Sequence, residues 1–179
     1  MRSGTLVLPP LILLQDYQNN WDQYLEAIYQ IFCRDFVTSK PDFEGKRFAL
    51  KRHPMIKGKE ATFWHIISEG DVEDERLPDL RRCERIPWPR PMIEAIKFEQ
   101  IKWWRNRRKE EERIVIALDD FSYIVVLADR GDYVLLWTAY CVEQEHRRQK
   151  LRREYDAYRG EKAGAAPKNG TVTPSTHGR

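Results

Sequence analysis

The chain has 179 residues, and its 31 lysines and arginines against 28 aspartates and glutamates leave a net charge of only +3 at pH 7. This length suits one domain with a buried core, and so small a net charge does not by itself indicate nucleic-acid binding. The three cysteines (Cys33, Cys83, Cys141) show no CxxC or other ligand spacing, which argues against a disulfide framework and favours a cytoplasmic protein.

The first 19 residues contain the apolar run LVLPPLILL, Leu6 to Leu14. The run is too short to span a bilayer, is interrupted by two prolines, and is not followed by a clear small-residue cleavage site. We therefore expect residues 1–19 to form a strap packed on the domain rather than a targeting segment.

A helix of about four turns is predicted after Asn20, a residue type that caps helix N-termini. Apolar residues recur at helical spacing from Trp21 to Phe32 in this segment. The alternating pattern of KRFALKR, residues 46–52, then predicts a short strand.

The next segment, KGKEATFWHIISEG (residues 57–70), contains one of the four histidines of the chain. Phe63, Ile66 and Ile67 fall at i, i+3 and i+4, which favours a short helix, although the β-branched residues leave a strand open. On a helix, His65 points away from the apolar side. On a strand, it shares a face with Phe63 and Ile67 and is a core histidine.

An acidic surface loop, residues 71–79, leads into RRCERIPWPRP, residues 81–91. This stretch holds four arginines on a backbone that its prolines keep out of a regular helix or a central strand. Arginines held still in this way suit the binding of an anion. From Pro91, an apolar stripe predicts a helix that continues to about Arg108.

Three segments rich in β-branched and aromatic residues give the clearest strand signal: Arg113–Leu118, Ser122–Ala128 and Tyr133–Tyr140. They predict an antiparallel meander. A charged helix from Val142 to about Tyr158 follows, and residues 159–179 are expected to be a disordered tail. The predicted fold class is α+β: N-terminal helices packed on a central antiparallel sheet, followed by the charged helix, in a single ribonuclease-like domain of residues 20–158.

Polar residues from these segments could together cleave RNA. His65 can take up a proton near neutral pH, and an arginine of residues 81–91 can hold a phosphodiester and stabilise its transition state. Thr138 and Tyr140, at i and i+2 on one strand face, could orient the phosphate. A ribose 2′-hydroxyl would attack the adjacent phosphate without a metal or other cofactor. No set of acidic residues and histidines has convincing metal-ligand spacing, and no Walker, GxGxxG, HExxH or GxSxG motif occurs.

This arrangement resembles the barnase–EndoU–colicin–RelE-like nuclease superfamily, and in particular its phage- and prophage-encoded branch. The resemblance is carried by HPMIKGKEATFWHI (residues 53–66), RRCERIPWPRPMIE (81–94) and the meander ending in YVLLWTAY (133–140). It implies a metal-independent endoribonuclease that leaves 2′,3′-cyclic phosphate ends. Such an enzyme is often a toxin or mobile-element effector, controlled by a cognate antitoxin or immunity protein. The expected partners are RNA and that protein, with no membrane involved.

The resemblance also implies a site made of a histidine, one or more cations and a hydroxyl or phenol on the late strand. The matching catalytic residues are His65, Arg82, Arg85, Thr138 and Tyr140. The expected substrate-binding residues are His53, Lys57, Lys59, Arg81, Trp88 and Arg90, and no metal ligand is expected. His53 or Lys59 could serve as the general acid, and the sequence leaves open which of the arginines faces the phosphate.

Two other functions fit the same sequence. A non-catalytic nucleic-acid-binding or inhibitory protein of a mobile element would use the basic, aromatic-rich surface to hold phosphates and to stack on bases. An interaction protein would instead bind a partner through the charged helix from Val142 to Tyr158.

Overall fold

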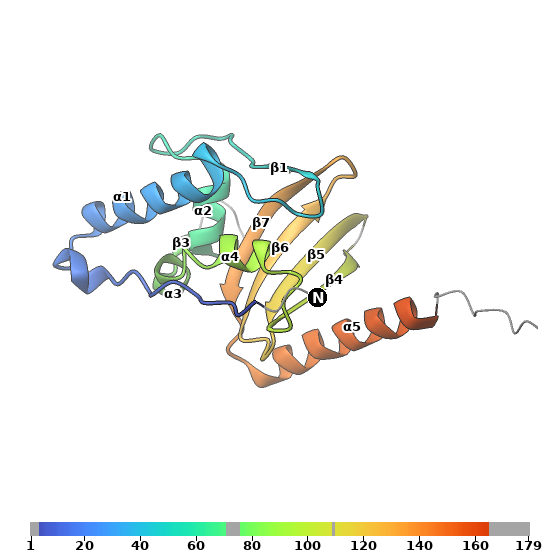
Figure 1. The fold of residues 1–179 in the computed structure, drawn as a ribbon. Coiled ribbons are helices and arrows are strands. Elements are labelled where there is room, and N and C mark those ends of the chain that lie inside the picture. The colour runs from blue at the N-terminus through green and yellow to red at the C-terminus, as the bar shows by residue number, and fades with distance from the viewer. Residues whose placement is uncertain (1–3, 71–75, 109, 165–179) are drawn as a thin grey trace, which may run out of the picture.

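A computed structural model describes residues 4–70, 76–108 and 110–164 of the chain. A five-stranded sheet lies at its centre, in the order β1-β7-β6-β5-β4 (Figure 1). The strands are β1 (Arg47–Ala49), β4 (Ile101–Arg108), β5 (Glu111–Leu118), β6 (Tyr123–Asp129) and β7 (Tyr133–Cys141). Strands β4 to β7 are antiparallel neighbours, which confirms the meander, whereas β1 pairs in parallel with the first three residues of β7. The sheet is therefore mixed rather than purely antiparallel.

Short elements make up the N-terminal half of the described chain. They are a 3₁₀ turn η1 (Leu14–Tyr17), α1 (Trp21–Phe32), a π-helical turn η2 (Cys33–Thr38), α2 (Ala61–Ile67), β2 (Ser68–Glu69), β3 (Leu77–Pro78), α3 (Leu80–Glu84) and α4 (Pro89–Glu94). The Asn20 side chain caps α1 by accepting a hydrogen bond from the Gln23 N–H. The long helix α5 (Glu145–Gly164) follows β7. The structure thus confirms the α+β class.

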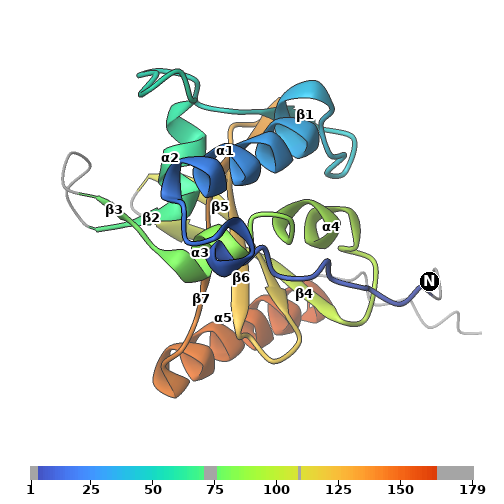
Figure 2. The same cartoon turned by 90° about the vertical axis from the view of Figure 1, so that its left-hand side faces the viewer.

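Both faces of the sheet are covered, and by different parts of the chain (Figures 1 and 2). On one face, strand residues such as Ile114 and Val125 join the side chains of α1, α2 and α4 in the larger core. On the other face, Trp104 and Ile124 belong to a second apolar layer that includes Tyr155 of α5. Alternate residues of the central strands therefore face two apolar layers.

Residues 101–108 form strand β4, so the predicted continuation of a helix to about Arg108 is wrong. Helix α4 ends at Glu94, and β4 pairs with β5 along all eight of its residues. Ile101 and Trp104 have helical spacing, but on the strand Ile101 lies in the larger core and Trp104 in the α5 layer. A strand that is buried on both faces lacks the alternation by which a strand is usually detected in a sequence.

Strand β7 contains an irregularity opposite Val126 and Leu127 of β6. Val126 pairs with Thr138 and Leu127 with Leu136, so Trp137 is the additional residue of a β-bulge. Trp137 and Thr138 both line the same cleft on the α5 side of the sheet. The bulge therefore brings two consecutive side chains to one face of a strand.

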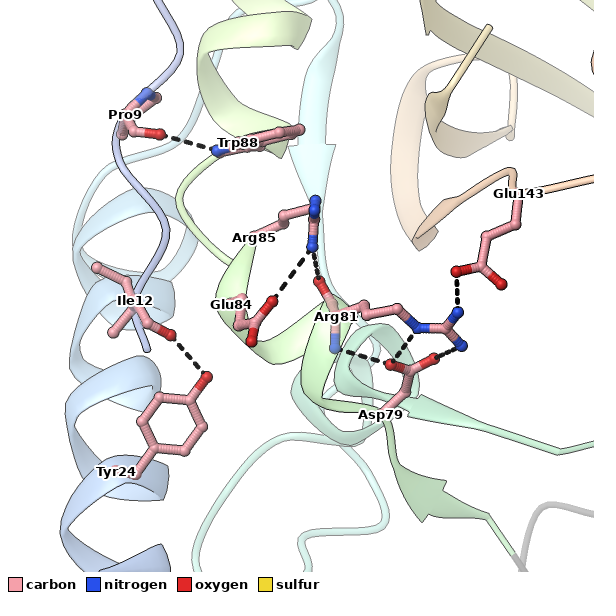
Figure 3. Close-up of polar contacts among 9 residues, drawn as sticks. All are labelled: Pro9, Ile12, Tyr24, Asp79, Arg81, Glu84, Arg85, Trp88 and Glu143. Carbon is pink, nitrogen blue, oxygen red and sulfur yellow. Dashed lines mark hydrogen bonds and ion pairs between the residues drawn. The ribbon is translucent and has the colours of Figure 1, made fainter. Parts of the chain in front are cut away.

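The N-terminal segment lies against α1 and the α3–α4 turn (Figure 3). The Trp88 Nε1–H donates a hydrogen bond of 2.9 Å to the Pro9 carbonyl, and the Tyr24 hydroxyl donates one of 2.8 Å to the Ile12 carbonyl. Apolar side chains of this segment, including Leu6, pack against the larger core.

Helix α5 continues past Tyr158 to Gly164, so residues 159–164 extend the helix although the sequence assigns them to the tail. Residues 165–179, the rest of the expected disordered tail, lie outside the described residues. The three cysteines are free. Within the described ranges, no helix combines the length and the apolar character needed to cross a membrane.

Trp104→Ala tests the placement of β4. Trp104 is 0 % exposed, and its ring lies 6.1 Å from Phe121 and 6.0 Å from Tyr155, measured between ring centroids. We expect the substitution to lower the free energy of unfolding by about 3–5 kcal/mol, as for other large core residues replaced by alanine. Urea denaturation followed by circular dichroism measures it. Leu77→Ala is the control, because Leu77 is 73 % exposed and its loss should change the free energy of unfolding by less than about 0.5 kcal/mol. Equal losses in the two variants would contradict this placement.

Candidate functional site

A cleft of about 650 Å³ opens between the sheet and helix α5. Side chains of β5, β6 and β7 form its floor, and the first half of α5 lies on one side. The end of α2, the small β2–β3 sheet and α3 lie on another side, and the adjoining ends of β4 and β5 contribute further residues. The ionisable and hydroxyl side chains that line it are His65, Ser68, Glu69, Arg76, Arg82, Arg108, Arg113, Thr138, Tyr140, Arg147, Lys150 and Glu154. Its volume is in the range of ligand-binding clefts.

Arg82 contacts two side chains of β7 inside the cleft. Helix α3 is capped by Asp79, whose side chain accepts a hydrogen bond from the Arg81 N–H. Arg82 Nη1 lies 3.4 Å from Thr138 Oγ1, and the guanidinium carbon lies 5.1 Å from the centroid of the Tyr140 ring. A guanidinium, a hydroxyl and a phenol therefore meet at one place in the cleft.

His65 lies in the last turn of α2, so the helical alternative is the one that the structure shows. The His65 ring is half-buried and packs edge-on against Trp137, with the ring centroids 5.4 Å apart. Nη1 of Arg76 lies 2.9 Å from His65 Nδ1. Because a guanidinium can only donate, Nδ1 accepts this hydrogen bond, and a neutral His65 ring then carries its proton on Nε2.

Other charged groups extend the cleft along β4, β5 and α5. The cations are Arg108, Arg113, Arg147 and Lys150. The guanidinium of Arg113 lies 5.5 Å from the centroid of the Trp137 ring, on the floor of the cleft. Among the described lining residues the carboxylates are Glu69 and Glu154, and Glu154 accepts a hydrogen bond of 3.1 Å from Asn106. Cations thus outnumber carboxylates around this cavity.

Part of this positive charge is desolvated and has no ion-paired carboxylate among the described residues, although the charges of Asp79 and Glu69 act on Arg82 from a distance. Burial lowers the pKa of Arg82, because it disfavours the charged form, and no carboxylate of the described chain forms an ion pair with it. Nε of Arg76 and Nε of Arg113 are buried and have no hydrogen-bond partner among the described residues, although Nη2 of Arg113 pairs with Glu111 at 3.2 Å. Holding cations in this way is unfavourable for the fold alone, so the arrangement points to an anionic ligand.

Of the predicted catalytic residues, the structure brings His65, Arg82, Thr138 and Tyr140 to this one cleft, but not Arg85. Arg85 donates a hydrogen bond of 3.0 Å to the Arg81 carbonyl and lies 5.1 Å from the Trp88 ring (Figure 3).

Two of the predicted substrate-binding residues, Arg81 and Trp88, also fall outside the cleft lining. Arg81 forms ion pairs with Asp79 and Glu143, and Trp88 anchors the N-terminal segment through Pro9 (Figure 3). Both residues are engaged in holding the fold together.

The other four expected substrate-binding residues lie elsewhere as well. Arg90 donates a hydrogen bond of 2.7 Å to the Asp35 carbonyl. Lys59 pairs with Glu26 at 2.6 Å, and its ammonium group lies 4.0 Å from the centroid of the Tyr29 ring. His53 and Lys57 are exposed in the loop before α2. The two candidates for the general acid, His53 and Lys59, are thus not among the residues that line the cleft.

Several lining residues were not predicted from the sequence: Glu69, Arg76, Arg108, Arg113, Trp137, Arg147, Lys150 and Glu154. Arg76 belongs to the segment read as an acidic loop, and its position depends on the pairing of β2 with β3. Arg113 shares a strand face with Val115 of the cleft, so a face-by-face reading of β5 could have found it. Arg147 and Lys150 are three apart on a helix, which also places them on one side.

The described ranges hold no group of three or more histidine, cysteine, aspartate or glutamate side chains that could bind a metal ion. The chain has no significant match among protein-family models, curated proteins or solved structures. Its function must therefore be argued from the chemistry of the cleft.

Arg82→Met tests whether the cleft charge serves the fold. The substitution removes a desolvated cation and keeps an apolar stem, so we expect the free energy of unfolding to stay unchanged or to rise by about 1–2 kcal/mol. Arg90→Met is the matched control. Arg90 hydrogen-bonds Asp35, Ser39 and Glu94, and its loss should cost about 1–2 kcal/mol. Urea denaturation compares the two, and a loss in Arg82→Met as large as that in Arg90→Met would show that Arg82 is structural.

Proposed function

We propose that the chain is a metal-independent endoribonuclease, which cleaves RNA by attack of a ribose 2′-hydroxyl on the adjacent phosphate. The observation that carries the proposal is the cleft that His65 lines together with partly buried arginines, Arg76 and Arg82 among them. Guanidinium groups match phosphate oxygens in geometry and charge, and a desolvated setting strengthens their interaction with a phosphate. The resemblance to the barnase–EndoU–colicin–RelE-like nucleases supports the same activity.

In the proposed reaction, the scissile phosphate binds beside Arg82, Thr138 and Tyr140. A base removes the proton of the 2′-hydroxyl, the 2′-oxygen forms a bond to phosphorus, and the bond from phosphorus to the 5′-oxygen breaks. The 5′-oxygen receives a proton from an acid, and the products are a 2′,3′-cyclic phosphate and a 5′-hydroxyl. The arginines stabilise the additional negative charge of the pentacoordinate transition state.

His65 is the proposed base, and Arg76 controls its availability. Nδ1 of His65 accepts a hydrogen bond from Arg76, so its lone pair is occupied. A phosphate in the cleft would draw the Arg76 guanidinium toward its own oxygens, because an ionised acceptor binds a guanidinium more strongly than a neutral ring nitrogen does. Nδ1 then no longer accepts the hydrogen bond from Arg76 and can accept a proton instead. Binding of the substrate and activation of the base are thus coupled.

Glu69 is the proposed second proton carrier. His53 and Lys59 do not line the cleft, whereas Glu69 does, and its charge acts on Arg82. Glu154 lines it from α5 but is held by Asn106. A phosphate bound in the cleft favours the protonated form of a nearby carboxyl group, and in that form Glu69 takes the place that the sequence left to His53 or Lys59 and gives its proton to the 5′-oxygen.

A cellular role as a toxin or mobile-element effector, held in check by a cognate antitoxin or immunity protein, follows from the same resemblance. A controlling protein with an acidic surface would complement the basic cleft. The alternative, a non-catalytic nucleic-acid-binding or inhibitory protein, would use the same cations without proton transfer, so it predicts binding of RNA without cleavage.

His65→Ala separates these functions. We expect the wild-type protein to cleave single-stranded RNA in the presence of EDTA, and the variant to lose about 10²–10⁴-fold in rate while it keeps its RNA affinity. Gel analysis of end-labelled RNA measures the rate and identifies the cyclic phosphate. A substrate with 2′-deoxyribose at the cleavage position should stay intact. His146→Ala is the control, because His146 is exposed on α5 and is not a lining residue of the cleft. Tight binding without any cleavage would favour the alternative function.

Glu69→Gln tests the second proton carrier. Glutamine keeps the shape of the side chain but cannot exchange a proton, so we expect one limb of the pH–rate profile to disappear together with a loss of about 10²-fold or more. Glu154→Gln is the matched control from the facing side of the cleft and should keep both limbs. If the two variants have the same profile as the wild type, the proton is carried by another group.

A further inference from the structure

A second hollow, of about 1,040 Å³, lies beside α5 and plays no part in the reaction proposed above. We call it the α5–β4 hollow, because the second half of α5 and the first residues of β4 line it together with the segment before β4 and the N-terminal strap. Its side chains combine cations with aromatic rings.

Four half-buried aromatic side chains line this hollow: Phe98, Trp103, Tyr155 and Tyr158. The rings of Trp103 and Tyr158 lie 6.4 Å apart, and the ammonium group of Lys162 lies 5.4 Å from the first and 5.0 Å from the second, measured to the ring centroids. Lys162 is an exposed, flexible side chain, so it can leave these rings for a phosphate while another group stacks on them.

The charge of the hollow is positive. Lys97, Lys102, Arg159 and Lys162 line it, with Glu99 as the one carboxylate among its described lining residues. Lys102 donates to the Glu99 carbonyl at 2.7 Å, and none of the four cations forms an ion pair within the described chain. Rings interleaved with free cations are the pattern by which proteins hold unpaired nucleotides.

The N-terminal strap gives the hollow a fixed side. Gly4 lies so close to Phe98 that a Cβ on Gly4 would be 2.4 Å from the ring, and the Leu6 N–H donates a hydrogen bond of 2.6 Å to the Gln100 side chain. The strap is therefore tied to the segment that carries Phe98, and that ring is held in place.

The hollow and the cleft lie at opposite ends of the same two elements. On α5, Lys150 lines the cleft and Lys162 the hollow, which separates them by about 18 Å along a helix. On β4, Asn106 lines the cleft and Lys102 the hollow, which gives about 13 Å along a strand. Both estimates place the two cavities only a few nucleotides apart along an extended strand. One single strand can therefore reach both cavities at once.

We propose that the α5–β4 hollow is a second RNA subsite, which holds unpaired bases of the same strand whose scissile phosphate lies in the cleft. The inference rests on the proposed ribonuclease function and adds to it the substrate class, single-stranded RNA. Stacking on Trp103 and Tyr158 requires bases with free faces, and a duplex buries those faces in its own stack.

The experiment compares single strands of about 4 and about 12 nucleotides, each with one ribonucleotide in a deoxy background, so that cleavage has one position. The ribonucleotide is placed near either end in two versions of the long strand. We expect the better long strand to exceed the short one in kcat/KM by about tenfold or more. The double substitution Lys102→Glu and Lys162→Glu should remove that advantage and leave the short strand unchanged. Tyr158→Ala should do the same through lost stacking.

Trp64→Ala is the control for loss of a half-buried ring, because Trp64 lines neither cavity, and it should keep the length advantage. Equal cleavage of short and long strands by the wild type would overturn the subsite and leave the ribonuclease function standing. If no strand is cleaved, fluorescence anisotropy of the labelled 12-nucleotide strand decides separately: weaker binding by the Lys102→Glu, Lys162→Glu variant supports the subsite, and unchanged binding overturns it.

Discussion

The pairing of strand β7 is the constraint on which the candidate site depends. Only its first three residues pair with β1, so the rest of that edge is free for α2 and α3, which pack against it. His65 and Arg82 reach the α5 side of the sheet around this edge, although most of the N-terminal half covers the opposite face. The bulge at Trp137 completes the arrangement, because it places an aromatic ring and the Thr138 hydroxyl side by side. A regular β7, or a longer β1, would leave the histidine and the arginine without a common cavity.

The basic stretch of residues 81–91 divides its arginines between two tasks. Arg81, Arg85 and Arg90 form ion pairs, contact a tryptophan ring or donate to backbone carbonyls, and thereby hold the N-terminal half together. Arg82 alone of the four lines the cleft, where burial lowers its pKa and no described carboxylate pairs with it. Such a charge opposes folding, and the two apolar layers of the sheet compensate for it. The unfavourable position of Arg82 is thus more informative about function than the density of cations around it.

The sequence supports the fold further than it supports the site. The meander, the first helix and the charged last helix have strong local patterns, and they are present in the structure. Strand β4 was mistaken for a helix because Ile101 and Trp104 pack into different layers, a fact that depends on α5. Thr138 and Tyr140 could be paired from strand spacing alone. Arg76 could not be placed beside His65, because that contact depends on how β2 and β3 pair, and the bulge at Trp137 has no marker in the sequence.

The small net charge of the chain hides how unevenly its charges are used. Carboxylates such as Asp129 are engaged in ion pairs away from the two cavities, Asp129 with Lys46 and Arg105, and they neutralise the surface there. Glu111 pairs with Arg130 and also with Arg113 at the edge of the cleft. The cations that line the cleft and the α5–β4 hollow have few such partners among the described residues. The interaction between two charges weakens with distance and is screened by salt, so carboxylates elsewhere on the chain do not cancel the charge of these two cavities. Both cavities therefore remain positive although the chain is nearly neutral. Helix α5 joins them, since its sheet-facing side packs on β4 and its two halves each line one cavity. In the proposed function, a strand of RNA attracted to either cavity would thereby be directed toward the other.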